Sequence, residues 1–400
     1  MALKYITEDS FKNNVKDKKV LVRFDFNVPM DKKDPSVISD TTRIDEALET
    51  IRFILELKPK KLILMSHFGR PKGKIDLKYS LEPVAKYLAS KLEEDVLLTE
   101  TALDRGIKTL LNLNEARIIL LQNLRFHEEE ENNDREFART LSTYADLFVF
   151  DAFGAAHRKH ASTFEINAFF KNKAYGGFLL KKEIEALDKV VHNPVKPFVA
   201  IVGGAKVSDK IKIIDSLLVS VDKLLIGGAM AYPFLKAKGH DVGDSLCTEE
   251  DVLLAKRILG TPSRNKVILP SDHIVSETFG GAPIDLGQVN IPAGKMGLDI
   301  GPSTLQNYTD YLKTAKTVLW NGPMGLFENK DFSKGTMGIA KVLANLDAFT
   351  LVGGGDSVSA VKISGLSDKM SHISTGGGAS LEYIENGSLP GIFALKFGIE

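Results

Sequence analysis

The chain has 400 residues, of which 44% are hydrophobic and 26% are charged, as is ordinary for a globular protein. Basic and acidic residues both number 52, and this zero net charge argues against a non-specific nucleic-acid binder. The single cysteine, Cys247, excludes an intrachain disulfide and favours a reducing compartment. The length favours two domains.

The first residues do not have the pattern of a signal peptide, because Lys4, Glu8 and Asp9 interrupt any apolar stretch. No apolar run in the chain approaches the ~18 residues that a membrane span needs. We therefore expect a cytoplasmic protein without membrane or nucleic-acid partners.

Short apolar runs recur along the chain, and each ends at a small or polar residue. Continuous runs of this kind are typical of strands that are buried on both faces, as in a parallel sheet. They predict strands at 19–25, 61–66, 117–122, 147–151, 198–203, 223–227, 266–270, 317–321 and 349–353.

Apolar residues with helical spacing lie between many of these runs, at 45–57, 178–191 and 210–221. Alternating strands and helices indicate an α/β protein. The acidic run 128–131 predicts the solvated start of a helix. We expect two doubly wound, Rossmann-like parallel-sheet domains with a cleft between them, joined by a connector helix at 178–191. The connector helix and residues 192–194 after it are the predicted hinge elements.

The strand ends of the first half carry polar and basic residues, and ligands of open parallel sheets bind beyond the carboxyl ends of the strands. Arginine is a good bidentate partner for carboxylate and phosphate. The residues that would together form a basic pocket for a small polyanion are Arg43, Arg70, Arg125, Arg158, His67 and His157. Taken singly, each arginine could equally be a surface ion-pair partner. The histidines lack an accompanying set of zinc ligands.

The strand ends of the second half carry glycines. The stretch 203–210 follows a predicted strand and opens a predicted helix. Glycine at such a position lets backbone N–H groups approach phosphate. Lys206 and Lys210 are four residues apart, so they are predicted to share one helical face. A tight turn with two surface lysines is the alternative. Glycine clusters recur at 227–228, 353–355 and 376–378, and four such turns at strand ends are hard to explain by structure alone.

Two acidic residues of the second half have two interpretations each. Asp356, beside Ser357, could contact Mg²⁺ together with substrate phosphates, or it could be a helix N-cap. Glu328 follows the predicted strand 317–321 and could accept hydrogen bonds from ribose hydroxyls, or it could belong to a rigid connector.

Taken together, these motifs resemble those of the phosphoglycerate kinase family over essentially the whole chain. The segments that carry the resemblance are 22–29, 67–71, 123–126, 151–153, 156–158, 203–211, 320–328, 353–357 and 375–380. The resemblance implies reversible, Mg²⁺-dependent phosphoryl transfer between ATP and the carboxylate of 3-phosphoglycerate, giving 1,3-bisphosphoglycerate and ADP in glycolysis and gluconeogenesis. It also implies a hinge-bending enzyme, which we expect to be a monomer.

The resemblance assigns one ligand to each domain. Residues 1–177 with 388–400 would bind 3-phosphoglycerate, because the last residues fold back in this family, and 178–387 would bind the nucleotide. The residues implied for 3-phosphoglycerate are Asp25, Phe26, Asn27, Arg43, His67, Phe68, Gly69, Arg70, Arg125 and Arg158. Those implied for the nucleotide are Lys206, Lys210, Gly228, Gly297, Glu328, Gly354, Gly355, Asp356 and Ser357, with Asp356 toward Mg²⁺.

The resemblance implies catalytic roles for Arg43, Lys206 and the backbone N–H groups of Gly376, Gly377 and Gly378 at the moving phosphoryl group. A carboxylate acceptor has a pKa near ~3.5–4 and is ionised at neutral pH, so the reaction needs no general base. It needs in-line positioning and charge neutralisation.

The chain departs from the family pattern at a few positions. Phe68 stands where leucine is usual, Gln122 where glutamate is common, and Ala229 in place of a third glycine near the expected adenine pocket. The ending 393–400 is also unfamiliar.

Two other classes of protein share features with this sequence. A nicotinamide-dependent dehydrogenase would share fold elements, but no G-x-G-x-x-G follows a predicted strand. A two-lobed anion-binding protein usually carries a secretory signal, which this sequence does not show.

Overall fold

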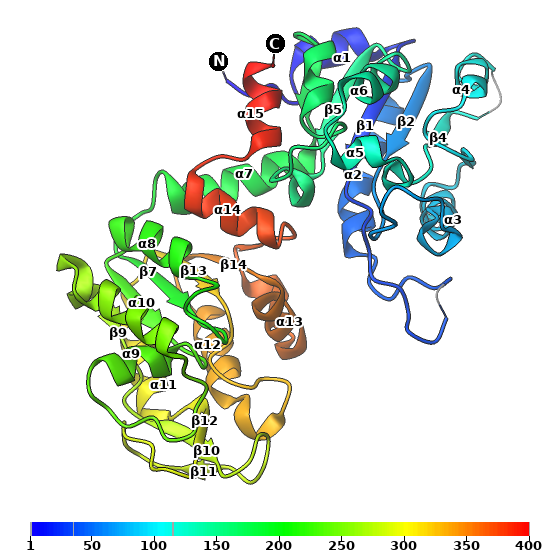
Figure 1. Cartoon of the computed structure of the whole chain (residues 1–400). Helices are drawn as coiled ribbons and strands as arrows, with labels where there is room; N and C mark the ends of the chain where they lie inside the picture. The colour runs from blue at the N-terminus through cyan, green and yellow to red at the C-terminus, as the bar shows by residue number, and fades with distance from the viewer. Residues whose placement is uncertain (1, 35, 114–115, 400) are drawn as a thin grey trace. The chain divides into compact units, whose positions relative to one another are not determined.

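The fold is described from a computed structural model of the chain, which describes residues 2–34, 36–113 and 116–399. The chain divides into two compact units, Met1–Ile184 with Ser388–Glu400 and Glu185–Gly387. The predicted boundary after residue 177 lies at the start of helix α7 (Phe178–Val191), whereas the units divide within that helix. Figure 1 shows α15 (Pro390–Phe397), drawn in red, at the end of the chain.

The first unit is built around one six-stranded parallel sheet. Its strands are β1 (Lys19–Phe24), β2 (Lys61–Met65), β3 (Val96–Leu98), β4 (Ile118–Leu120), β5 (Leu147–Asp151) and β6 (Ala174–Gly176). Its further helices are α1 (Asp9–Val15), α2 (Thr42–Glu56), α3 (Glu82–Leu92), α4 (Arg105–Leu110), α5 (Glu128–Glu131) and α6 (Arg135–Ser142). Short 3₁₀ helices are η1 (Leu77–Tyr79), η2 (Leu124–Phe126), η3 (Phe153–Ala155) and η4 (Glu165–Phe169).

The strand order of this sheet is β3-β4-β2-β1-β5-β6, with every neighbouring pair parallel. The chain moves from β1 to one side of the sheet through β2, and it returns to the other side of β1 at β5. The order therefore reverses at β1 and β5, which is the position where open α/β sheets bind ligands.

The second unit has a six-stranded parallel sheet and a small antiparallel one. The parallel strands are β7 (Phe198–Val202), β8 (Lys223–Ile226), β9 (Val267–Ile268), β13 (Thr317–Asn321), β14 (Phe349–Gly353) and β15 (His372–Ile373). The antiparallel strands are β10 (His273–Ser276), β11 (Ile284–Asp285) and β12 (Met296–Ile300).

The remaining helices of this unit connect the strands. They are α8 (Ile211–Ser220), α9 (Ala231–Ala237), α10 (Glu249–Leu259), η5 (Pro262–Lys266), α11 (Pro302–Lys313), η6 (Lys330–Phe332), α12 (Lys334–Leu343), α13 (Gly355–Ser364), η7 (Ser367–Lys369) and α14 (Gly378–Asn386). The parallel order is β15-β14-β13-β7-β8-β9, so the order here reverses at β7 and β13.

The predicted fold class is confirmed, and each of the nine predicted strand segments contains a strand. Strands β2, β5, β7 and β13 are buried along their whole length, as continuous apolar runs predict. The sequence analysis missed β3, β6, β15 and the antiparallel sheet, whose strands have only two to five residues. None of the described helices combines the length and apolarity needed to cross a bilayer.

One sequence expectation about solvent exposure is wrong. The acidic run 128–131 does form a helix, α5, but Glu130 on it is fully buried. Glu130 lies inward because its carboxylate accepts two hydrogen bonds from Ser162.

The connector helix α7 starts at a buried carboxylate. Asp151, at the end of β5, accepts a hydrogen bond from the Leu180 N–H at 2.8 Å through Oδ1. The Thr50 hydroxyl accepts another from the Phe178 N–H at 3.0 Å. Together they satisfy backbone donors of the first turn, which have no partner within the helix. Burial raises the pKa of Asp151 to about 7.

We predict a pH-dependent effect of Asp151→Asn on stability. The folded pKa exceeds the unfolded one, so the folded state binds more protons between about pH 4 and pH 7. The contribution of Asp151 to stability therefore falls as the pH rises through this window. The variant should gain stability relative to the parent over the same window, by up to a few kcal/mol at about 1.4 kcal/mol per pKa unit. Thermal unfolding of both proteins across this range measures it.

The matched control is Asp95→Asn at an exposed position. A stability difference for Asp151→Asn that does not change with pH would contradict the prediction.

Candidate functional site

The polar strand-end residues of the first unit follow four neighbouring strands. Asp25 follows β1, His67 follows β2, Asn123 follows β4, and Arg158 lies beyond β5. Because parallel strands end at the same edge of a sheet, residues up to about 130 positions apart in the sequence come together there. We call this site the basic pocket; it also includes Asn27, Arg43, Gly69, Arg70 and Arg125.

Hydrogen bonds link the members of the basic pocket. Arg43, in the first turn of α2, donates through Nη1 to Asp25 Oδ2 at 3.0 Å and to the Asn27 carbonyl at 3.1 Å. The Asn27 side chain in turn accepts from the Gly69 N–H at 2.9 Å, and the Gly69 carbonyl accepts from Arg125 Nη1 at 2.7 Å. The carboxylate and the two arginines are thus parts of one connected network.

Burial sets the electrostatics of the basic pocket. The side chains of Asp25, His67 and Arg125 are each less than a tenth exposed. Burial, followed by the positive charges of Arg23, Arg125, Arg158 and Arg43, holds the pKa of His67 well below its usual value. Burial also lowers the pKa of Arg125 to about 10, against the opposing effect of Glu131. An anion bound here would offset this excess of positive charge.

The remaining predicted pocket residues differ in solvent exposure and in the groups that they contact. Arg70 is exposed, and Arg158 donates through Nε to His157 Nε2 at 3.2 Å. Phe26 and Phe68 are buried, with Phe26 stacked on Phe24 and Phe68 edge-on to Tyr79. The two phenylalanines are therefore packed in the interior, next to the polar residues of the pocket.

Sequence reasoning missed four buried polar residues around the pocket, namely Arg23, Asn123, Glu130 and Ser162. Asn123 accepts from the N–H groups of Phe68 and Arg125 and donates to the carbonyls of Phe68 and Tyr79, so it holds two strand-end loops together. For Arg23 and Asn123 the usable signal was a basic or amide residue inside or directly after an otherwise apolar run, whereas Glu130 and Ser162 lie in no such run. Gln122 is also structural, since Oε1 accepts from the N–H groups of Leu81 and Asn123.

In the second unit, glycine-rich loops follow β7, β8 and β13, which are adjacent in the sheet. The N–H of Gly203 donates to Asn321 at 2.9 Å, and that of Gly228 donates to Met324 at 3.0 Å. The N–H of Met230 donates to Gly204 at 3.0 Å. The three loops are therefore in direct backbone contact at the point where the strand order reverses.

The glycines of these loops fall into two groups. A Cβ on Gly228, whose φ is +65°, would lie 2.7 Å from backbone atoms of Gly204, so close loop packing requires glycine there. A Cβ on Gly297 would lie 2.0 Å from the Tyr232 hydroxyl. By contrast, apart from the adjoining backbone, no heavy atom of the described residues lies within 4 Å of a Cβ on Gly355, Gly377 or Gly378. These three glycines therefore have open space beside their backbone.

One prediction about the lysines is wrong. Lys206 and Lys210 do not share a helical face, because α8 begins at Ile211 and Lys206 lies exposed in the preceding loop. Lys210 points inward and donates through Nζ to Asn321 Oδ1. Burial lowers its pKa, while Asp356 and other carboxylates oppose that shift. Asn321, which the sequence analysis did not select, also donates to the Gly353 carbonyl at 2.9 Å.

The N-cap alternative for Asp356 is also wrong. Helix α13 has Gly354 as its N-cap, with φ +87°, and Asp356 is an exposed residue of its first turn. Ser357 is buried and accepts from the Gly322 N–H at 2.5 Å. Glu328 is exposed in the turn after β13. No cluster of three or more histidine, cysteine, aspartate or glutamate side chains suited to a metal occurs among the described residues.

The loop 374–377 leads into α14. Its first glycine, Gly376, donates its N–H to the Ser374 hydroxyl at 3.2 Å, and Ser374 and Ser380 are hydrogen-bonded at 2.5 Å. The φ of Gly377 is +54°, which L side chains rarely adopt. Ala229 packs its methyl against the apolar cluster around Tyr232 and Leu235.

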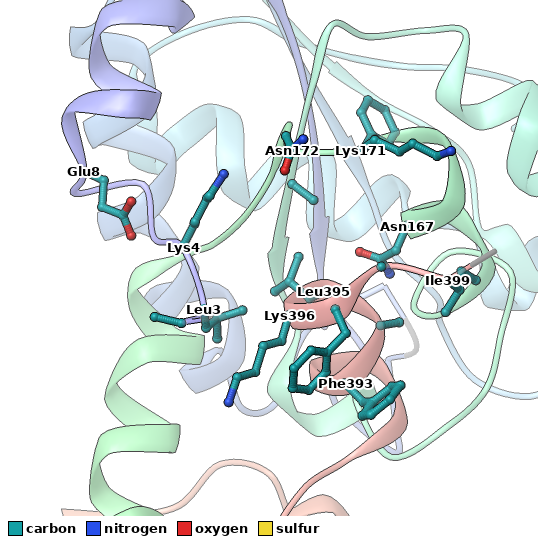
Figure 2. Close-up of a pocket in the computed structure, with 16 residues that line it drawn as sticks. Leu3, Lys4, Glu8, Asn167, Lys171, Asn172, Phe393, Leu395, Lys396 and Ile399 are labelled. Atoms are coloured by element: carbon teal, nitrogen blue, oxygen red, sulfur yellow. The ribbon is translucent and has the colours of Figure 1, made fainter.

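A separate groove of about 780 Å³ lies in the first unit, between the N-terminal segment and α15 (Figure 2). Leu3, Lys4, Lys171, Phe393 and Lys396 are among the residues that line it. None of the predicted site residues does, so the groove is distinct from the basic pocket.

Two parallel α/β units, one with a basic strand-end pocket and one with glycine-rich strand-end loops, are typical of a two-domain phosphotransferase. The family model "Phosphoglycerate kinase" matches residues 10–387. The phosphoglycerate kinase of Anaeromyxobacter dehalogenans (strain 2CP-C) is 52% identical over 390 residues, covering 95% of this chain and 96% of that protein. That of Clostridium novyi (strain NT) is 49% identical over 389 residues, covering 96% of each.

A solved structure gives the same result. The phosphoglycerate kinase from Coxiella burnetii superposes with a TM-score of 0.87 at 38% identity, covering 96% of this chain and 97% of that one. The chain belongs to the phosphoglycerate kinase family. It is therefore an enzyme, an ATP-dependent kinase of glycolysis, and the dehydrogenase and anion-binding-protein alternatives are not supported.

We predict opposite consequences for alanine at two of the glycines. Gly228→Ala should lower the melting temperature by several degrees, because a positive φ and a backbone clash cost about 1–3 kcal/mol. Gly378→Ala should leave the melting temperature unchanged, since alanine suits a helix and meets no atom. It should nevertheless lower the kinase activity ~10-fold or more if a phosphoryl group approaches this backbone.

Thermal unfolding and a steady-state assay on the same preparations separate the two effects. Full activity of Gly378→Ala would refute the role of this loop.

Proposed function

We propose that the first unit binds 3-phosphoglycerate in the basic pocket and that the second unit binds ATP or ADP at its glycine-rich loops. The observation that carries the proposal is the connected network of Asp25, Arg43, Asn27, Gly69 and Arg125 at adjacent strand ends. The carboxylate could accept from a substrate hydroxyl, while the guanidinium groups suit the carboxylate and phosphate of the substrate.

Arg43 is the residue that we assign to the transferring group. Its described hydrogen bonds both use Nη1, which leaves Nε and Nη2 for a ligand. Its side chain is 32% exposed, whereas the side chains of Arg23 and Arg125 are almost fully buried. The Arg43 guanidinium is held in place through Nη1, and its other two nitrogens are available to donate. Such a group can stabilise the negative charge on the phosphoryl group during its transfer.

We assign the nucleotide phosphates to Lys206, Lys210 and the first turn of α13, and the transferring phosphoryl group to Gly376–Gly378. Mg²⁺ would contact Asp356, since proteins often hold this ion with one carboxylate plus substrate phosphates. The exposed position of Asp356 beside the open face of Gly355 fits such an ion. When bound, the ion would neutralise phosphate charge. Glu328 would contact the ribose.

The acceptor carboxylate of 3-phosphoglycerate is already ionised at neutral pH, so no side chain has to remove a proton. The residues of this chain have to position the two substrates in line and to neutralise their negative charge. We further propose that the protein is a cytoplasmic monomer, which agrees with a role in glycolysis.

We predict that Arg43→Ala lowers kcat ~10²-fold or more and changes the affinity for 3-phosphoglycerate much less. The reason is that a contact made in the transition state lowers kcat and kcat/KM together when it is removed. An ATP-dependent turnover assay with 3-phosphoglycerate measures both constants. The matched control is Arg52→Ala on the same helix, where the arginine donates to the Lys91 carbonyl.

A rise in KM at unchanged kcat would make Arg43 a binding residue only. Absence of ATP-dependent turnover in the parent protein would refute the proposed function itself.

We predict that Lys210→Ala weakens ADP binding ~10-fold or more and leaves 3-phosphoglycerate binding unchanged. The partly buried ammonium lies near Asp356 and donates to Asn321, so it is placed to meet a phosphate at these loops. Separate calorimetric titrations of the two ligands measure the difference, with Lys212→Ala on the exposed face of α8 as the control. Equal weakening of both ligands would indicate a folding defect.

A further inference from the structure

Beneath the basic pocket lies a fully buried arginine that the assigned binding residues do not include. Arg23, on β1, has no exposed surface. Its Nε donates to the Ser162 hydroxyl at 2.8 Å, its Nη1 donates to the Phe24 carbonyl, and its Nη2 lies 3.2 Å from His67 Nδ1. All three nitrogens of the guanidinium group are therefore engaged.

A buried carboxylate supports this arginine. Glu130, also without exposed surface, accepts from the Ser162 hydroxyl at 2.6 Å and from the Ser162 N–H at 3.0 Å. Its Oε1 lies 3.8 Å from Arg23 Nη2. A buried ion pair contributes little net stability but strongly disfavours any arrangement that separates the charges. Glu130 and Ser162 thus hold the guanidinium in one orientation.

That orientation determines the protonation state of His67. Arginine is only a donor, so Nδ1 of His67 must be the acceptor of the contact with Nη2. Asp25 Oδ1 lies 3.9 Å from the same nitrogen, too far to take a proton from it in a hydrogen bond. The proton of a neutral ring is therefore on Nε2, for which no hydrogen-bond partner occurs among the described residues.

The charges around His67 also oppose a second proton. The groups that face it are Arg23, Arg43, Arg125 and Arg158, with Asp25 as the nearby carboxylate. Burial and these four arginines lower the pKa of His67. The ring is thus a neutral donor among cations.

We propose that Glu130 and Ser162 are positioning residues that act through Arg23 to hold His67 as the neutral Nε2–H tautomer, so that His67 donates a hydrogen bond to the bound anion. A fixed donor of this kind adds directional recognition to the charge of the arginines, without a proton being gained or lost near neutral pH. The inference rests on the proposed binding of 3-phosphoglycerate in the basic pocket.

The first experiment uses the parent protein. Two-bond ¹H–¹⁵N spectra of the labelled histidine rings distinguish the tautomers, and the His67 signals are assigned by their loss in His67→Gln. We expect the Nε2–H form with no titration between about pH 5.5 and pH 8. A proton on Nδ1, or a ring that titrates in this range, would overturn the proposal.

The second experiment tests the positioning residues. Glu130→Gln replaces the carboxylate near Arg23 with a neutral amide, which removes the negative charge that holds the guanidinium. Ser162→Ala removes the hydroxyl that accepts from Arg23 Nε. Both variants should bind 3-phosphoglycerate ~10-fold more weakly while ADP binding stays unchanged. In both variants, the His67 signals should show a mixture of the Nδ1–H and Nε2–H tautomers. Glu128→Gln, at the exposed start of α5, is the matched control and should change neither.

A double-mutant cycle shows whether the effect passes through His67. In the His67→Gln background, Glu130→Gln should have little further effect on 3-phosphoglycerate affinity, and full additivity would refute the proposed route. If the parent protein does not bind 3-phosphoglycerate, the proposed function fails while the tautomer result still stands. If it binds with the other tautomer, only the present inference fails.

Discussion

The carboxyl ends of parallel strands meet at one edge of each sheet, and both candidate sites depend on this constraint. In the first unit, the edge brings Asp25, His67 and Asn123 together from three strands. In the second unit, it brings the loops after β7, β8 and β13 into backbone contact. The order of strands reverses beside the first strand of each sheet, so there is room for a ligand between the diverging loops.

Glycine serves two different physical purposes at these strand ends. Gly228 and Gly297 are needed because other protein atoms occupy the space of a side chain. Gly377 and Gly378 have free space beside them, so packing does not explain the absence of a side chain. The glycine pattern in the sequence looks the same in both cases, since only neighbouring atoms separate a packing role from a ligand-facing one.

A polar layer lies beneath the basic pocket. Arg23, Glu130 and Ser162 are buried and satisfy one another's hydrogen bonds, and Asn123 ties the adjacent loops. Such a layer is tolerated in a protein interior only when its members are partnered. This layer orients His67 through Arg23, and Asn123 holds the backbone of Phe68 and Arg125.

The α/β class, the nine principal strand segments and most strand-end residues were predictable, because they follow from apolar runs and from the residues that end them. The family was predictable from the motifs that resemble it. Helix α7 even has its predicted bounds, since its apolar spacing is regular. The short strands β10, β11 and β15 were not predicted because none of them has more than two consecutive apolar residues. Tertiary structure alone decided that Glu130 is buried, that Lys206 lies outside α8, and that Arg23 faces His67. The physical reason is that burial and hydrogen-bond partners come from segments distant in the chain, and no local pattern encodes them.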